Sequence, residues 1–246
     1  MNKVDILGVN VDKVDIPEAV ERIFKMLSEN RPHAVYTPNS EIIMTAYKDE
    51  EFRAVLNSAD MLTADGIGVV YASKILGNPI AGRAAGYDIA CEVIERIAET
   101  GHGLYLFGGK PGVAEEAQRR LDEKYPFIRI VGTHDGYFSD AELPEIIDDI
   151  NNSGADIVFV CLGAPAQEKW IYNNMHKLNV RVLMGVGGTV DVLAGTAERA
   201  PEMWRRLGLE WFYRLLKQPS RFFRMMALPK FALTVLFKGE RYSGDE

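Results

Sequence analysis

The sequence predicts an α/β fold, in which a mainly parallel sheet carries helices on both faces and a helical segment follows at the C-terminal end. Three observations support this prediction. Short apolar runs alternate with amphipathic helical patterns up to about residue 200. Glycine-rich turns follow several of these runs, as at the strand ends of Rossmann-like sheets. Beyond about residue 200, basic and aromatic residues replace the alternation.

The apolar runs have the length and composition of buried strands. Strands are expected at residues 4–10, 33–37, 60–63, 103–107, 128–132, 156–161 and 181–186. The segments between these runs have the periodicity of amphipathic helices. Helices are expected near residues 17–29, 40–57, 66–76, 86–99, 111–124, 141–152 and 165–177. Because the two patterns alternate, the strands should run parallel, with the helices as crossover connections.

The chain is expected to divide into an α/β body, residues 1–200, and a C-terminal appendage, residues 201–246. With 246 residues, of which 47% are apolar, it is long enough for one large domain and such an appendage. Arg199-Ala200-Pro201 interrupts the alternating pattern. Pro219 and Pro229 should then divide the appendage into short helices, because proline ends or kinks a helix.

The appendage has a distinctive charge. Residues 203–238 hold eight Lys or Arg against one acid, whereas the whole chain carries a net charge of −7. Interleaved basic and aromatic residues favour an anionic, apolar partner, such as a bilayer with anionic lipids or a lipid-linked diphosphate. The alternative is a helix that packs on the body and turns its Lys and Arg to water. Nucleic acid is not expected as a partner, because the chain is acidic and contains no nucleic-acid-binding motif.

Cysteine usage and hydropathy bear on where the protein works. Cys91 and Cys161 lie in apolar surroundings outside any CxxC pair, which favours buried thiols in a reducing compartment. The N-terminal residues lack the apolar core of a signal peptide. No apolar run has the length of about 18–20 residues that spans a bilayer. We therefore expect a cytoplasmic protein that associates peripherally with the inner face of the cell membrane. Its apolar appendage offers a surface for a homo-oligomer, and the oligomeric state stays open.

Glycine-rich turns follow three of the expected strands. They contain Gly108-Gly109, Gly163 and Gly187-Gly188. Ligands of open α/β sheets gather at the carboxyl ends of the strands, where glycine lets the backbone approach a phosphate and helix N-termini offer free N–H groups. The turns therefore favour a bound diphosphate, although tight strand-to-helix turns need glycine as well. Neither a GxGxxG nor a P-loop pattern is present, which disfavours NAD and ATP.

Three polar side chains at strand ends or in loops are candidate site residues. Asp65 follows one expected strand and precedes a helix, so it is either a catalytic carboxylate or the N-cap of that helix. Asn39 has the same two interpretations. Arg83 lies in a loop of small residues, where it either binds an anion or simply faces water.

Several chemical patterns are missing from the sequence. No two aspartates are separated by a single residue, so there is no DxD motif for a metal-bound diphosphate. The four histidines show no metal-ligand spacing, and no GxSxG nucleophile motif occurs. We therefore expect neither a metal nor a cofactor. A diphosphate would then be neutralised by Arg, Lys and backbone N–H groups.

Several short motifs occur together in one known family. They are Thr37-Pro38-Asn39, Ala64-Asp65-Gly66-Ile67-Gly68, Phe107-Gly108-Gly109, Leu162-Gly163-Ala164-Pro165-Ala166-Gln167-Glu168, Gly185-Val186-Gly187-Gly188, Arg199-Ala200-Pro201 and Gly208-Leu209-Glu210-Trp211. With this combination the chain resembles the WecG/TagA/CpsF glycosyltransferases over essentially its whole length. It is most similar to the TagA branch of that family.

The resemblance implies an inverting hexosyltransferase that acts in wall teichoic acid synthesis. The donor would be UDP-N-acetylmannosamine. The acceptor would be the 4-hydroxyl of GlcNAc-diphospho-undecaprenol, and the product a β-1,4 linkage. The family looks metal-independent, in agreement with the missing DxD motif. Other branches transfer the uronic acid, so UDP-N-acetylmannosaminuronic acid is an alternative donor.

The resemblance also implies roles for particular residues. The aspartate of the family falls on Asp65, which would act as general base. The implied catalytic and pocket residues are Asp65, Thr37, Asn39, Arg83 and Gln167. The implied contacts to the nucleotide and the acceptor diphosphate are Gly108, Gly109, Tyr137, Gly163, Val186, Gly187, Gly188, Asp191, Arg214, Arg221 and Arg224. The appendage would then close over the site of the catalytic body.

Two other classes of function compete with this interpretation. An NAD-dependent oxidoreductase is the first, because doubly wound sheets often bind dinucleotides. The missing GxGxxG motif disfavours it. A non-catalytic adaptor at a membrane surface is the second, and it leaves the polar residues at the strand ends without a role.

Overall fold

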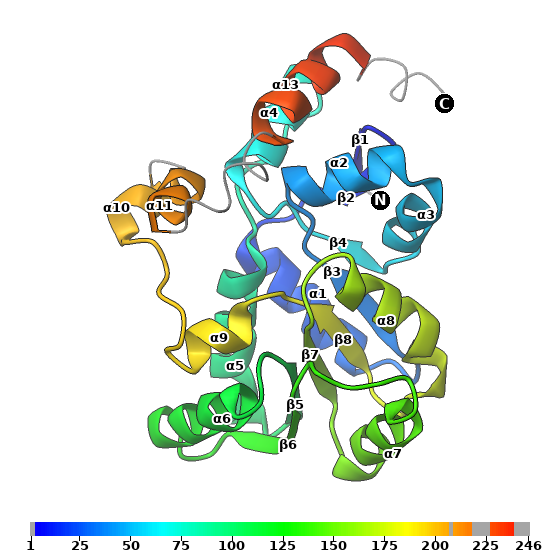
Figure 1. Cartoon of the computed structure of the whole chain (residues 1–246), viewed down its shortest axis with the longest axis vertical. Helices are drawn as coiled ribbons and strands as arrows, with labels where there is room; N and C mark the ends of the chain where they lie inside the picture. The colour runs from blue at the N-terminus through cyan, green and yellow to red at the C-terminus, as the bar shows by residue number, and fades with distance from the viewer. Residues whose placement is uncertain (1–2, 207–208, 218–226, 239–246) are drawn as a thin grey trace.

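The protein is built around a parallel sheet of six strands (Figure 1). The computed structural model describes residues 3–206, 209–217 and 227–238. The strands of the sheet are β3 (His33–Tyr36), β4 (Met61–Leu62), β5 (Gly103–Gly108), β6 (Arg129–His134), β7 (Ile157–Cys161) and β8 (Val182–Gly185). Their order is β4-β3-β8-β7-β5-β6, and every pair is parallel. The predicted α/β fold is therefore confirmed.

Helices cover both faces of the sheet, as expected. Those of the body are α1 (Ile16–Leu27), α2 (Ser40–Lys48), α3 (Glu50–Asn57), α4 (Ile67–Ile75), α5 (Gly86–Thr100), α6 (Val113–Lys124), α7 (Leu143–Ser153), α8 (Ala166–Asn174) and α9 (Thr189–Leu193), with a short 3₁₀ helix at Met175–Lys177. Alternate strand residues enter two separate cores. Tyr105 and Phe107 of β5 pack with α7 and α8, whereas Leu104 and Leu106 pack with α5 and α6. This alternation follows from the two-residue period of a strand.

Two sequence predictions in the N-terminal third were wrong. Residues 4–10 do not form one strand of the main sheet, but belong to an antiparallel hairpin of β1 (Lys3–Ile6) and β2 (Val9–Asp12). Its turn is made by Leu7 and Gly8, which both have positive φ, at 57° and 87°. Such a turn reverses the chain within two residues, and the apolar pattern alone does not reveal it.

The second wrong prediction was a single helix over residues 40–57. The chain forms α2 and α3 instead, with a break at Asp49. The backbone of Asp49 is extended, and its carboxylate accepts a hydrogen bond from the N–H of Phe52 at 2.9 Å. A new N-cap therefore begins a new helix, and the second helix packs in a direction of its own.

The C-terminal segment is mainly helical where it is described. Its helices are α10 (Glu202–Arg206), α11 (Glu210–Lys217) and α13 (Ala227–Lys238). Helix α13 lies against α2 and α4 (Figure 1). Phe231 and Val235 of α13 are buried in the same core as Ile43 of α2 and Val69 of α4. The alternative of a helix that packs on the body therefore describes α13.

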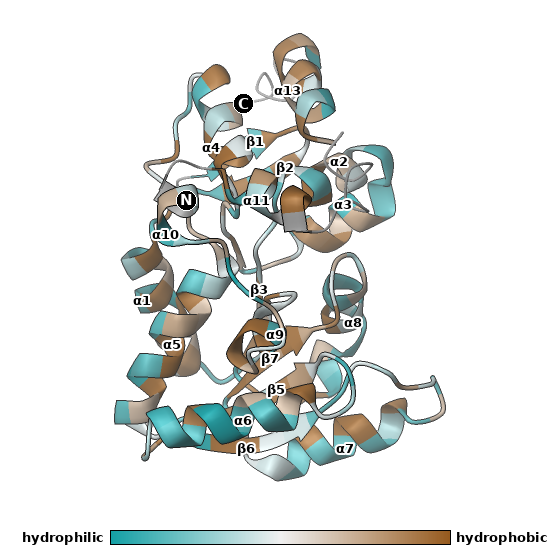
Figure 2. Ribbon diagram, turned by 60° about the vertical axis from the view of Figure 1, so that its left-hand side comes forward, coloured by the Kyte–Doolittle hydropathy of each residue, from teal (hydrophilic) through white to brown (hydrophobic). Residues whose placement is uncertain are grey.

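The outer surfaces of these helices are not uniformly polar. Figure 2 shows hydrophobic stretches on α4 and α13, whereas α6 is largely hydrophilic on the side that faces the viewer. Large apolar side chains that remain exposed on the C-terminal helices include Met203, Trp211, Phe212, Leu216, Leu233, Leu236 and Phe237. Within the described residues, no helix combines the length and hydropathy needed to cross a bilayer.

Candidate active site

The parallel sheet places all six strand ends at one edge. The segments that follow the strands there are Thr37–Asn39, Thr63–Asp65, Gly108–Gly109, Asp135–Tyr137, Leu162–Gly163 and Val186–Gly188. Strands β7 and β8 come last in the chain, yet they lie between β3 and β5. The connections on the two sides of this position run in opposite directions, and α/β proteins bind ligands at such switch points.

Asp65 lies in this edge, directly after β4. Its backbone N–H donates a hydrogen bond to the carbonyl of Pro38 at 3.1 Å, which joins the ends of β3 and β4. The N-cap of α4 is Gly66, with φ of 119°, and no side chain caps this helix. The interpretation of Asp65 as the cap of α4 was therefore wrong. Its carboxylate interacts with the positive charge of Arg83, and its role as a base stays a prediction.

Asn39 is the N-cap of α2. Its side-chain oxygen accepts hydrogen bonds from the N–H groups of Glu41 at 2.9 Å and Ile42 at 3.1 Å. The capping interpretation of this residue is thus confirmed. A Cβ atom placed on Gly66 would lie 3.8 Å from the Cβ of Asn39, so the cap stands beside the Asp65 turn. A contact between Asn39 and a sugar stays a prediction.

Thr37 and Gln167 are buried and bound to the backbone around the end of β8. The Thr37 hydroxyl donates a hydrogen bond to the carbonyl of Gly185 at 3.1 Å. The Gln167 amide accepts from the N–H of Gly187 at 2.9 Å and donates to Glu168 at 2.9 Å. Both side chains therefore fix the turn after β8. Their direct contact with a substrate stays a prediction.

Arg83 connects the body to the C-terminal segment. Its guanidinium donates hydrogen bonds to Glu210 of α11 at 2.8 Å and to Asp88 of α5 at 3.2 Å. Arg199 binds both oxygens of the same Asp88 carboxylate, each at 2.6 Å. We call Arg83, Asp88, Arg199 and Glu210 the carboxyl-edge cluster. It attaches Glu210 of α11 and Arg199 to the body near Asp65.

Burial and pairing act in opposite directions on the pKa values of this cluster. Burial by itself would lower the pKa of Arg83, but the hydrogen bond to Glu210 and the charges of Asp65 and Glu210 raise it above its ordinary value. Burial would raise the pKa of Asp88, but the hydrogen bonds and charges of Arg199 and Arg83 lower it. All these ionic partners therefore favour the charged forms.

Asp88, Arg199 and Glu210 were not predicted as site residues. Arg199 and Glu210 stand inside the two C-terminal motifs that carried the family resemblance, so a signal existed for them. Asp88 lies in the first turn of α5, where an acidic residue is ordinary. Nothing in its local sequence indicates that it joins two arginines.

The glycine turns are needed for packing. Gly108 has φ of 131°, and a Cβ atom there would lie 2.4 Å from the carbonyl oxygen of Cys161 in β7. Gly109 accepts a hydrogen bond from the N–H of Gly136 at 2.8 Å. The N–H of Gly187 is already bound to Gln167. Tight turning thus accounts for these glycines, and diphosphate binding over them stays a prediction.

The remaining predicted contacts are spread around the same edge. Tyr137 follows β6 and is exposed, Val186 is buried at the end of β8, and Asp191 lies in α9. At Gly163 a Cβ atom would meet nothing within 4 Å, so the space above this turn is open. These residues thus lie at or near the same edge, and their contact with a nucleotide stays a prediction.

The three predicted C-terminal arginines are largely untested. Arg221 and Arg224 lie outside the described residues, and Arg214 belongs to α11, of which only its backbone is described. Metal binding has no visible site in the described part of the chain, since no group of three or more His, Cys, Asp or Glu side chains gathers there in a suitable arrangement.

The fold is a Rossmann-like α/β sheet with helices on both faces, and comparison with known proteins gives the family. Residues 4–244 match the glycosyl transferase WecG/TagA/CpsF family. The chain therefore belongs to this family of glycosyltransferases, as its motifs predicted.

Named relatives cover most of the chain. The N-acetylglucosaminyldiphosphoundecaprenol N-acetyl-beta-D-mannosaminyltransferase of Bacillus subtilis (strain 168) is 41% identical over 82% of this chain and 78% of its own. The protein of the same name from Bacillus spizizenii is 39% identical over 88% and 83%. That of Staphylococcus aureus (strain MRSA252) is 36% identical over 93% and 90%.

Proposed function

We propose that this protein transfers N-acetylmannosamine from UDP-N-acetylmannosamine to the 4-hydroxyl of GlcNAc-diphospho-undecaprenol, with inversion at the sugar and without a metal ion. The observation that carries the proposal is the 36–41% identity, over most of the chain, to relatives named as N-acetylglucosaminyldiphosphoundecaprenol N-acetyl-beta-D-mannosaminyltransferases. The position of Asp65 beside Arg83 at the carboxyl edge supports it. The product would be the β-1,4-linked disaccharide that begins a wall teichoic acid.

In the proposed reaction Asp65 is the general base. Inversion is simplest as one displacement, in which the acceptor oxygen attacks C1 of the donor sugar while the bond from C1 to UDP breaks. Asp65 would take the proton that the acceptor hydroxyl loses. The positive charge of Arg83 interacts with this carboxylate. A positioned base of this kind contributes about 10²–10⁴-fold to the rate.

The neighbouring residues would bind and orient the substrates. Thr37, Asn39 and Gln167 surround the ends of β3 and β8, where the sugars would lie. UDP would extend over the turns at Gly108–Gly109, Gly163 and Val186–Gly188, with Tyr137 and Asp191 near the nucleoside. Because no metal is proposed, arginine side chains would neutralise the negative charge of the leaving diphosphate.

The C-terminal segment, residues 201–246, would complete the site. Glu210 is bound to Arg83 at 2.8 Å, so α11 already lies beside the reacting edge. Arg214, Arg221 and Arg224 would then approach the diphosphate of the donor or the acceptor. The exposed Phe212 and Leu216 would face the membrane that holds the acceptor lipid. These features support a peripheral position at the inner face of the cell membrane, and they leave room for self-association there.

A transfer assay tests the proposal. The full chain is mixed with GlcNAc-diphosphate on a short polyprenyl chain and, in separate reactions, with UDP-N-acetylmannosamine, UDP-N-acetylmannosaminuronic acid or UDP-N-acetylglucosamine. We expect UDP release and a disaccharide product with the first donor alone. NMR of the product should show the β anomer. Faster transfer of the uronic acid, or an α-linked product, would contradict the proposal.

A further inference from the structure

We propose that an apolar groove between α4 and α13 binds the first isoprenoid units of the acceptor lipid. This inference rests on the proposed function, because the acceptor is then a sugar diphosphate attached to a polyprenyl chain. The diphosphate lies near Asp65 during transfer, so the lipid attached to it must leave the site along a neighbouring surface. The structure provides one such surface directly beside Asp65.

The groove is lined by three helices. Ile67, Tyr71 and Ile75 of α4 face Phe231, Ala232 and Val235 of α13, and Trp211 of α11 adds an aromatic ring. None of the lining residues carries a charge. Its volume is about 210 Å³. Since a cavity of about 150 Å³ holds a benzene ring, the groove has room for roughly one to two five-carbon isoprene units.

The groove begins at the candidate active site. Ile67 and Gly68 line it, and they follow Asp65 and Gly66 directly in the chain. At Gly68 a Cβ atom would lie 2.4 Å from the hydroxyl of Ser40 in α2 and 3.8 Å from Leu228 of α13. Helix α4 therefore packs closely against α2 and α13 at this end. From Ile67 to Ile75 helix α4 rises by about 12 Å. The groove therefore leads away from Asp65 along α4.

Parts of the lining are exposed to water. The exposed fractions are 57% for Tyr71, 48% for Ile75 and 37% for Trp211. Grouped exposed apolar side chains indicate a binding surface, and a flexible hydrocarbon chain would cover them. A second copy of the chain or a bilayer could also cover such a surface. The continuity with Asp65 favours the acceptor lipid, because neither of the others needs to start at the reacting group.

The first test is the dependence of transfer on lipid length. We compare acceptors that carry GlcNAc-diphosphate on a farnesyl chain or on a methyl group. Ala232 is exposed on α13 and lines the groove, so Ala232→Trp fills the groove without disturbing the core. Leu233→Trp is the matched control, because Leu233 is an exposed neighbour outside the groove lining.

We expect the original protein to prefer the farnesyl acceptor by about tenfold or more in KM, from the apolar area that an isoprene unit buries. This preference should fall to about one in Ala232→Trp and persist in Leu233→Trp. An absent preference in the original protein, or equal loss in both variants, would overturn the inference. So would a change of oligomeric state in Ala232→Trp without lipid, or loss of binding to vesicles of phosphatidylglycerol that contain no polyprenyl lipid.

The second test does not depend on sugar transfer. Geranyl diphosphate, which has two isoprene units, carries a benzophenone at its far end and is irradiated with the full chain, and the labelled peptides are identified by mass spectrometry. We expect labels within residues 67–75 and 227–238, and their loss in Ala232→Trp. Labels elsewhere would overturn the inference. If the groove is labelled but no acceptor is glycosylated, the proposed function fails while the lipid site stands.

Discussion

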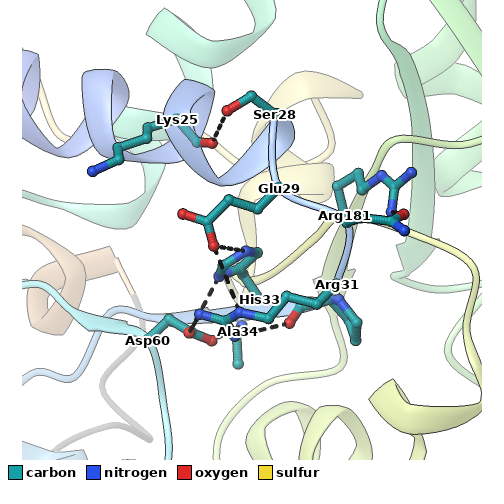
Figure 3. Close-up of polar contacts among 10 residues, drawn as sticks. Lys25, Ser28, Glu29, Arg31, His33, Ala34, Asp60 and Arg181 are labelled. Atoms are coloured by element: carbon teal, nitrogen blue, oxygen red, sulfur yellow. Dashed lines mark hydrogen bonds and ion pairs between the residues drawn. The ribbon is translucent and has the colours of Figure 1, made fainter.

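Two clusters of charged side chains lie at opposite ends of the same strands, and they are built differently. At the amino ends of β3 and β4, His33 is buried between Glu29 and Asp60, with 3.2 Å from each ring nitrogen to a carboxylate oxygen (Figure 3). Arg31 binds Asp60 at 2.7 Å, and the N–H of Ala34 donates to Asp60 at 3.0 Å. We call Glu29, Arg31, His33 and Asp60 the amino-edge cluster. The carboxyl-edge cluster lies near the carboxyl ends of these strands, where Arg83 binds Glu210 of α11.

The difference lies in what each cluster joins. The amino-edge cluster comes from residues 29–60, which belong to one part of the sheet. The carboxyl-edge cluster joins Arg83 to Glu210, which are 127 residues apart, and it lies beside the candidate base. Charged side chains near strand ends thus have two uses. One set fixes neighbouring strands, and the other attaches a C-terminal helix to the edge that holds the candidate base.

The largest effect is expected for Asp65→Asn. The amide keeps the size of the side chain but cannot accept a proton, so kcat should fall by about 10²–10⁴-fold. Binding of UDP, measured by calorimetry, should be preserved. The matched control is Asp60→Asn in the amino-edge cluster, which should retain kcat. Unchanged turnover in Asp65→Asn would remove the base from the mechanism.

The second largest effect is expected for Arg83→Gln. Loss of its positive charge beside Asp65 and of its bond to Glu210 should lower kcat by about 10²-fold, the usual cost of one electrostatic contact in an active site. Arg31→Gln changes the same residue type at the amino edge and should leave kcat unaltered. A double-mutant cycle with Glu210→Gln should give a coupling energy of about 0.5–3 kcal/mol. Additive losses of kcat would show that Arg83 and Glu210 act independently.

A smaller effect, on stability alone, is expected for Asp60→Asn. The change removes one of the two carboxylates that contact Arg31 and His33 and leaves only Glu29, so the free energy of unfolding should fall by about 1–3 kcal/mol. Urea unfolding at neutral pH measures this loss. If Asp60→Asn kept the stability of the original protein but lost turnover, the amino-edge cluster would serve activity and not stability.

Both clusters should also respond to acid. Burial would raise the pKa of Asp60 and of Asp88, but the hydrogen bonds and charges of Arg31 and Arg199, respectively, lower both below the usual value of about 3.9. A lowered folded-state pKa stabilises the protein above the unfolded-state pKa, and this contribution disappears as pH falls through the folded-state pKa. Unfolding free energy should therefore decline below about pH 4. Asp60→Asn and Asp88→Asn should each flatten this decline, and a slope unaltered in both would contradict the assignment.

The smallest effect is expected for metal removal. If arginines and backbone groups neutralise the diphosphate, excess EDTA should change the rate of UDP release by less than about twofold, since one metal contact is worth far more than this. Added Mg²⁺ or Mn²⁺ should not increase the rate. A rate that EDTA abolishes and Mg²⁺ restores would show that the charge at this edge is balanced by a metal.

Most of the fold could be predicted from the sequence, because its signals are local. The six apolar runs that form the sheet are continuous, and the amphipathic helices between them have a clear period. The N-terminal hairpin and the break at Asp49 were missed, because a turn at Leu7–Gly8 and a cap at Asp49 depend on backbone angles that hydrophobic periodicity does not report. Motifs located the site edge, but they did not distinguish the cap at Asn39 from the uncapped turn at Asp65.

By itself the sequence determined the α/β class, the family and the segments that lie at the carboxyl edge of the sheet. Those properties follow from local patterns in the order of the residues. Only the tertiary structure decided that Asp88 joins Arg83 to Arg199, that Glu210 holds α11 beside Asp65, and that α13 forms a groove with α4. The physical reason is distance along the chain. Contacts between residues more than a hundred positions apart depend on how the strands are ordered in the sheet, and no local pattern contains that order.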